Sequence, residues 1–128
     1  MKLRAIRENH LYSKAYAKGK KFVGRRVVVY ALPDYAAGRL QKADPMHRRQ
    51  NRIGITVTKK TGGAVQRNRI KRIIREAYRC LEKELAIKKG FLLVIVARPS
   101  ALNAKMGDIS SDLSAAFEKL MLLAEKKK

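Results

Sequence analysis

The residues best suited to chemistry in this chain are basic side chains on one predicted helix. After the turn at Gly62 and Gly63, apolar residues recur at steps of three and four, the spacing of one helix face: Ile70, Ile73, Ile74, Ala77 and Leu81. At about 100° per residue, the opposite side carries cations and one amide: Arg67, Asn68, Lys71, Arg72, Arg75 and Arg79. The pattern predicts a helix with one apolar and one cationic face.

A charged helix face is most often a solvated surface, and such a face normally mixes acids with bases. Here Glu76 is the only acid between Lys59 and Arg79. Most of the basic residues are arginines, whose planar guanidinium matches phosphate oxygens in pairs. We therefore expect an anionic partner, and the pattern is the charge footprint typical of nucleic-acid binders.

Two tyrosines near the amino terminus form a second candidate surface. Tyr12 and Tyr16 are four residues apart, so they share one face of a helix. Tyr30 lies in a β-branched run and could meet that face from a strand. Helical aromatics usually pack into a core, with a tyrosine hydroxyl at the rim. In so basic a chain these rings could instead stack unpaired bases.

Length and composition narrow the class of protein. The chain has 128 residues, enough for one domain, residues 1–128, with one modest core. Its 31 Lys and Arg against 10 Asp and Glu give a net charge of +21, which opposes compaction unless a polyanion neutralises it. No apolar run approaches the roughly 18 residues of a membrane span, so no membrane partner is predicted. The single Cys80 excludes an intrachain disulfide and suits a reducing cytoplasm.

The chain offers no set of residues suited to hydrolysis. There is no carboxylate cluster for two metal ions and no pair of histidines for acid–base cleavage. Cys80 and His10 each lack a neighbouring residue that would support a nucleophile or a metal ligand. We therefore predict no catalytic residue, no metal ligand and no cofactor bound by the protein.

Six elements must position these residues, in the order helix, strand, strand, helix, strand, helix. Hydrophobic periodicity and breaker residues give the ranges: a helix over 4–18, strands over 25–32 and 52–59, the basic helix from about 66 to about 88 closed by Gly90, a strand over 91–97, and a helix from 110 to about 125. Residues 33–51 are predicted to be a loop, and 126–128 a frayed tail. This order predicts an α+β fold, a two-layer α/β sandwich with a small mixed sheet.

The basic helix also carries a resemblance to a known family. The run Arg67-Asn68-Arg69-Ile70-Lys71-Arg72-Ile73-Ile74-Arg75-Glu76, preceded by Thr56-Val57-Thr58-Lys59-Lys60 and Gly63-Ala64-Val65, resembles the signature of the bacterial ribonuclease P protein subunit. The resemblance covers most of the chain and is weakest over 32–51 and after residue 99. Strand–helix–strand crossovers are generally right-handed, whereas the resemblance implies a left-handed crossover around the basic helix.

The resemblance implies a function. The family protein assists a catalytic RNA in the endonucleolytic removal of the 5′ leader from precursor transfer RNA, and magnesium is the cofactor of that RNA-centred reaction. The implied partners are the ribonuclease P RNA and the single-stranded leader, with no protein partner. The implied RNA-binding residues are Lys59, Lys60, Arg67, Asn68, Arg69, Lys71, Arg72 and Arg75. The implied leader cleft is lined by Tyr12, Tyr16, Phe22, Tyr30 and Thr56, with tyrosine at two helix positions where the family often has phenylalanine.

Two other functions fit the composition. A ribosomal or other structural RNA-binding protein would be equally basic, and only the motif at 67–76 argues against it. A helix-turn-helix DNA binder would insert the basic helix into a major groove, but the strands predicted on both sides of that helix argue against this fold.

Overall fold

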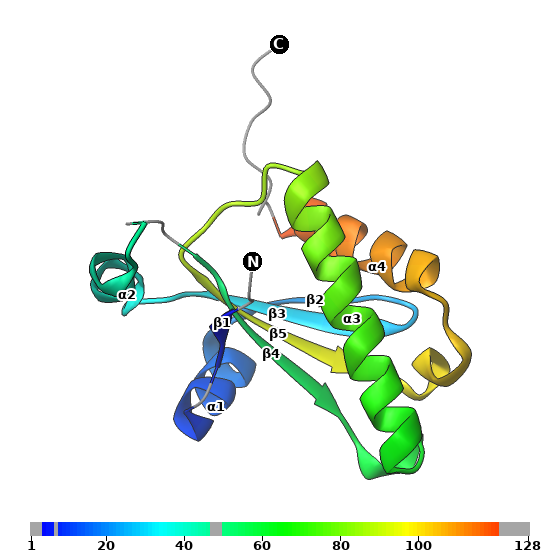
Figure 1. Ribbon diagram of the computed structural model, residues 1–128. Helices are drawn as coiled ribbons and strands as arrows, with labels where there is room; N and C mark the ends of the chain where they lie inside the picture. Colours follow the sequence, from blue (N-terminus) through cyan, green and yellow to red (C-terminus); the bar gives the residue numbers. More distant parts are fainter. Residues whose placement is uncertain (1–3, 7, 47–49, 121–128) are drawn as a thin grey trace.

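The computed structural model of the chain describes residues 4–6, 8–46 and 50–120. These residues form a five-stranded mixed sheet flanked by helices (Figure 1). The order across the sheet is β1-β4-β5-β3-β2, and the strands are β1 (Arg4–Ala5), β2 (Lys20–Val23), β3 (Val27–Pro33), β4 (Arg52–Val57) and β5 (Phe91–Ala97). β5 pairs parallel to β4 and antiparallel to β3. The predicted α+β class, mixed sheet and parallel pair are confirmed.

Helices lie on both faces of this sheet. They are α1 (Asn9–Lys18), α2 (Ala37–Ala43), α3 (Ala64–Glu84) and α4 (Met106–Lys119), with short 3₁₀ helices η1 (Lys59–Thr61) and η2 (Pro99–Asn103). α3 and α4 pack side by side over the face that carries Val29, Leu93 and Ile95, which are fully buried (Figure 1). The opposite face carries Leu92 and Val94 and is covered in part by α1. α1 thus adds a third, partial layer to the predicted two-layer sandwich.

Alternation of side chains along β5 explains why helices are needed on both faces. Leu92, Leu93, Val94 and Ile95 are consecutive and all at most 2% exposed. Successive residues of a strand point to opposite faces, so a continuous apolar run requires cover on each side. The predicted burial of this strand is confirmed.

Three short elements were not expected from the sequence. Residues 4 and 5 form β1 beside β4, where the prediction has the start of a helix; a two-residue strand is too short to show alternation. β2 pairs antiparallel with β3 as an edge strand. The predicted loop over 33–51 contains α2, whose only buried residue is Ala37, so it carries no apolar stripe to reveal it. Residues 47–49 of that loop lie outside the described residues.

Two predicted boundaries are also wrong. α3 ends at Glu84 rather than near residue 88, and the chain turns there to bury Ile87. Gly90 does not close the helix; its φ of 91° serves the turn into β5, where only glycine is unstrained. α4 begins at Met106, before the predicted residue 110, because the Asp108 carboxylate accepts the Lys105 N–H at 2.9 Å. The predicted end of this helix and the predicted tail lie outside the described residues.

Candidate nucleic-acid interface

The helix α3 has the two faces that its sequence predicts. Its apolar side is buried against the sheet and α4: Ile70, Ile74, Ala77, Tyr78 and Leu81. The helix starts cleanly because the Gly63 N–H donates to the Gln66 side-chain oxygen at 2.9 Å, and the Gly63 carbonyl accepts the Arg67 N–H at 2.9 Å. The buried side fixes the rotation of α3, so the basic side must face solvent.

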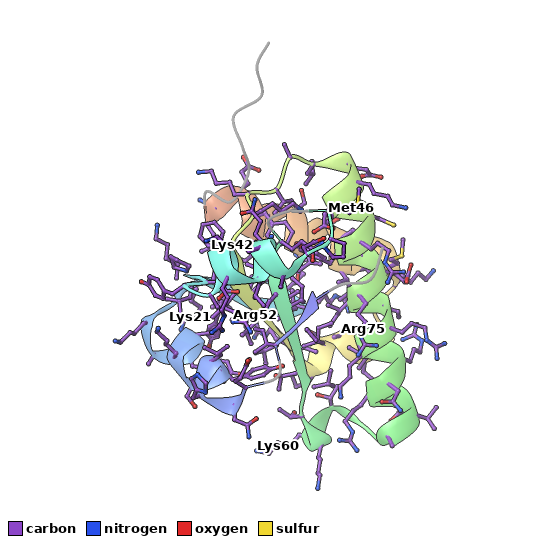
Figure 2. The ribbon with its side chains drawn as sticks, turned by 60° about the vertical axis from the view of Figure 1, so that its left-hand side comes forward. Lys21, Lys42, Met46, Arg52, Lys60 and Arg75 are labelled. Atoms are coloured by element: carbon purple, nitrogen blue, oxygen red, sulfur yellow. The ribbon has the colours of Figure 1, made fainter. Side chains whose placement is uncertain are left out.

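The basic side of α3 and the lysines before it form one open surface. Arg67 and Lys71 are half-buried, while the rest are exposed: Lys59, Lys60, Asn68, Arg72 and Arg75. Among the described residues, none of these cations takes part in a salt bridge. Figure 2 shows Lys60 in η1 and Arg75 on α3. The Nε of Arg67 is buried without a hydrogen-bond partner among the described residues. We call this surface the basic surface. Its positive charge is not compensated by acidic side chains of the described residues, so it can attract an anionic partner.

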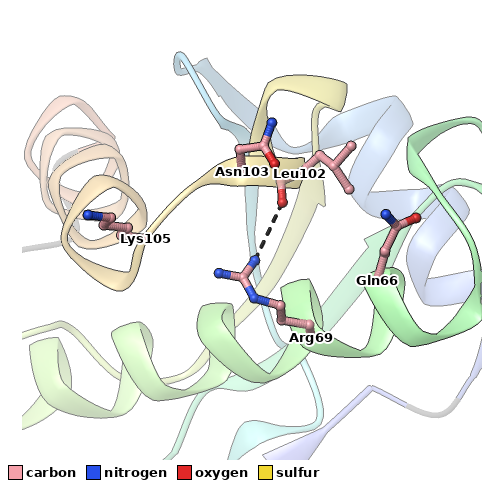
Figure 3. Close-up of a pocket in the computed structure, with 5 residues that line it drawn as sticks. All are labelled: Gln66, Arg69, Leu102, Asn103 and Lys105. Atoms are coloured by element: carbon pink, nitrogen blue, oxygen red, sulfur yellow. Dashed lines mark hydrogen bonds between the residues drawn. The ribbon is translucent and has the colours of Figure 1, made fainter.

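Arg69 is placed differently from the other predicted RNA-binding residues. Its guanidinium donates to the carbonyl oxygens of Leu102 and Ala104, each at 3.4 Å, and so links α3 to the segment after β5. Figure 3 shows the Leu102 contact and the pocket of about 330 Å³ that Arg69 lines together with Gln66, Leu102, Asn103 and Lys105. These contacts are long, so they hold Arg69 only loosely toward η2.

The structure brings together four of the five residues predicted to line the leader cleft. The rings of Tyr16 and Tyr30 meet edge-on, with centroids 4.9 Å apart and an angle of 79° between their planes. The Tyr16 hydroxyl lies 3.5 Å from Thr56 Oγ1. Tyr12 lies over Gly54, where any Cβ would come within 2.6 Å of the Tyr12 ring. The expected meeting of Tyr30 with the tyrosine face of α1 is confirmed. We call these residues the tyrosine cluster: Tyr12, Tyr16, Tyr30 and Thr56.

Phe22 does not join the tyrosine cluster, contrary to the prediction. In the β2–β3 pairing Phe22 stands opposite Val29, and cross-strand partners share a face of the sheet. Val29 is fully buried, and Phe22 packs against the core on its side of the sheet. Lys21, which stands opposite Tyr30, lies on the tyrosine side of the sheet together with Val23, which stands opposite Val28. Sequence reasoning missed Lys21 because the register of β2 was unknown.

The cluster is partly open to solvent and electrically neutral. Tyr16 is 45% exposed, and its three companions are half-buried. Burial raises the pKa of Tyr12, and the neighbouring Tyr16 raises the same pKa further. Tyr12 therefore keeps its proton at neutral pH and places no negative charge against a nucleic-acid backbone. An exposed aromatic ring beside small polar side chains suits the stacking of bases.

The described residues show no metal site and no membrane helix. Among residues 4–6, 8–46 and 50–120, no group of three or more His, Cys, Asp or Glu is placed to hold a metal ion. The magnesium implied by the resemblance thus finds no such ligand set on the protein within those ranges. In the same part of the chain, no helix has the length and apolar character to cross a membrane.

Comparison with known proteins agrees with this geometry. The family model described as Ribonuclease P matches residues 1–121. The ribonuclease P protein component of Clostridium acetobutylicum is 37% identical over 96% of this chain and 93% of its own length. That of Clostridioides difficile is 34% identical over 86% of this chain and 85% of its own.

Solved structures give the same answer at the level of the fold. The Staphylococcus aureus RNase P protein superposes with a TM-score of 0.72 at 27% identity, covering 96% of this chain and all of the other. The Thermotoga maritima protein, at 22% identity, shares the fold with a TM-score of 0.71 over 91% of this chain and 96% of its own. The motif at 67–76, the fold and the relatives together show that the chain belongs to the family of bacterial ribonuclease P protein components.

Proposed function

We propose that this chain, as one RNA-binding domain, holds two RNA segments on two different surfaces. The basic surface of α3, together with Arg69, binds the catalytic RNA of ribonuclease P. The tyrosine cluster, with Lys21 beside it, binds the unpaired 5′ leader of precursor transfer RNA. In the holoenzyme the catalytic RNA then cleaves the leader, with magnesium as the cofactor of that reaction.

One observation carries this proposal, namely that Tyr16 is left exposed although it contacts residues of two strands. Tyr16 on α1 contacts Tyr30 on β3 and Thr56 on β4, yet it is 45% exposed. Packing explains the half-buried Tyr12 and Tyr30, but it gives no reason to place a third tyrosine beside them and leave it open. Each exposed aromatic offers a face or an edge to any base, which suits a leader of variable sequence.

Two features of the proposal come from the family rather than from the geometry, namely the left-handed crossover from β4 through α3 to β5 and the use of magnesium in the reaction. We propose them for this chain because it carries the family motif at 67–76, on the helix that forms the crossover. The absence of a protein partner is proposed on the same basis. The cytoplasm is proposed as the compartment because the single Cys80 suits a reducing environment.

The test is reconstitution. The full chain is mixed with ribonuclease P RNA and magnesium, and the affinity for precursor transfer RNA is compared with that for mature transfer RNA. The proposal expects the protein to strengthen binding only where a leader is present. RNA that copurifies with the chain from its cells is sequenced in parallel. Recovery of ribosomal RNA without ribonuclease P RNA would contradict the proposal in favour of a ribosomal role.

A further inference from the structure

A polar pocket lies on the opposite side of α1 from the tyrosine cluster. Its volume is about 250 Å³, and it opens where β3 ends and β4 begins. Lys14 is two residues from Tyr12 and so points about 200° away from it around the helix. The pocket is lined by residues of α1, of β4 and β5, and of the segment containing α2, among them His10, Lys14, Tyr35, Arg39 and Arg52.

Both acidic residues of this pocket, Asp34 and Glu8, are bound by Arg52, and the three cations of the lining outnumber these two acids. Arg52 is 8% exposed, and its guanidinium donates two hydrogen bonds, of 2.7 and 3.0 Å, to the Asp34 carboxylate. The same guanidinium donates to Glu8 at 3.1 Å. The hydrogen bonds that Arg52 donates to Asp34 raise the pKa of the guanidinium, so Arg52 stays charged. Lys14 and Arg39 remain as cations without a salt bridge among the described residues, which makes the pocket attractive to an anion.

An exposed aromatic ring borders these cations. Tyr35 is 79% exposed, the most open aromatic side chain described. The Lys14 ammonium lies 4.6 Å from the centroid of its ring, within the range of a cation–π contact. This contact holds the ring beside the pocket while most of its surface stays free. An aromatic ring next to two cations is the combination that single-stranded nucleic acid uses, with the base stacked on the ring and the phosphate near the cations.

We propose that this pocket binds one unpaired ribonucleotide, with its base on Tyr35 and its phosphate between Lys14 and Arg39. The small volume suits a single base rather than a longer segment. The inference rests on the proposed function, because it adds a position to an RNA-binding surface. Tyr35 and Arg39 belong to the segment 33–51, where the motif-based resemblance is weakest, so the inference does not rest on that resemblance. The nucleotide comes from the substrate leader or from the catalytic RNA.

The test uses the holoenzyme assembled from the full chain and ribonuclease P RNA. Precursor transfer RNAs with leaders lengthened one nucleotide at a time are titrated against wild type, Tyr35→Ala and Tyr35→Phe. Affinity of each protein for the ribonuclease P RNA is measured separately. Lys14→Gln and Arg39→Gln test the cations, and Lys119→Gln on α4 is the matched control for loss of an exposed charge.

Tyr35→Ala is expected to weaken one of the two affinities about 5- to 140-fold, the range for loss of one base–aromatic stack, whereas Tyr35→Phe keeps wild-type affinity. If the leader supplies the nucleotide, the loss appears only beyond a threshold leader length. If the catalytic RNA supplies it, assembly weakens and the dependence on leader length is unchanged. Losses no larger than those of Lys119→Gln in both measurements would overturn the inference.

The proposed function is judged separately in the same experiment. Tyr16→Ala tests the tyrosine cluster on the same set of leaders. A leader-specific loss in Tyr16→Ala with none in Tyr35→Ala would overturn the pocket alone. A wild-type holoenzyme without any leader dependence or RNA affinity would overturn both.

Discussion

Tyr16 and Tyr78 are the same residue type in opposite surroundings. Tyr16 is 45% exposed, its ring meets Tyr30 edge-on, and its hydroxyl has one long contact, to Thr56. Tyr78 is 1% exposed, packs edge-on against Phe117, accepts a hydrogen bond from Asn51 and donates one to Glu82. A buried aromatic with a satisfied hydroxyl serves the fold, whereas an open one has surface left for a ligand. These two tyrosines therefore give different results when they are changed.

Replacement of Tyr16 by alanine is expected to leave folding intact and to weaken leader binding. Little buried area is lost, so the melting temperature stays near that of wild type. One base stack is lost, worth about 1–3 kcal/mol, and only for precursors that carry a leader. Tyr16→Phe keeps the ring and should bind nearly as well as wild type. A large drop in melting temperature, or an equal loss of affinity for leaderless RNA, would contradict the prediction and give Tyr16 a structural role.

Alkaline pH is expected to destabilise the chain through Tyr78. Burial raises the pKa of Tyr78, so the folded state keeps a proton that the unfolded state, with a tyrosine pKa of about 10, has lost. The stabilisation is complete below about pH 10 and declines as the pH rises above that value. Urea unfolding from pH 8 to 11.5 should show a shallower decline for Tyr78→Phe. Equal slopes in both proteins would rule out this contribution, because the two proteins differ only at residue 78.

At the scale of elements, α3 joins the core to the basic surface, and strand register decides which side chains share a face. The buried residues of α3 fix its rotation, and the cations follow on the other side. In β2 a shift of one residue would exchange Phe22 and Lys21 between the two faces of the sheet. The pairing with β3 puts Phe22 against the core and Lys21 on the tyrosine side.

The basic surface is expected to make binding strongly dependent on salt. If it neutralises about six phosphates, the slope of log K against log salt concentration is about −4 to −5, at roughly −0.7 to −0.9 per phosphate. Arg72→Ala should reduce the slope by about one unit at most. Titrations of ribonuclease P RNA at several salt concentrations measure it, with Lys119→Ala on α4 as control. A slope near zero for wild type would mean that the surface is only solvated.

At the scale of the whole molecule, charge and architecture point to a protein that completes an assembly. The chain carries a net charge of +21, and among the described residues its salt bridges involve only Arg52, Arg79 and Lys89 on the basic side. So much uncompensated charge favours binding to a polyanion. The α3–α4 face of the sheet supports the basic surface, and the α1 face carries the tyrosine cluster. The two RNA contacts that we propose thus lie on two faces of the sheet.

The isolated protein is expected not to cleave RNA. The described residues place no metal-binding cluster, and the sequence provides no acid–base pair. Pure protein freed of RNA is incubated with precursor transfer RNA and magnesium, and the 5′ ends of the products are mapped. Addition of ribonuclease P RNA to the same tube is the positive control. Specific 5′ cleavage by the protein alone would contradict the expectation and assign chemistry to its side chains.

The sequence by itself determined what depends on local period and composition. Local pattern predicted the two faces of α3, the buried strand β5 and the family motif, because each lies within one segment. The parallel β4–β5 pair followed from the two segments that flank α3, and the net charge followed from composition. Tertiary structure alone decided which segments meet. The position of Phe22 depends on the β2–β3 register, β1 exists only beside β4, and the pocket under Tyr35 needs α2, whose single buried residue leaves no apolar period. These features arise from pairing between distant segments, which local periodicity does not encode.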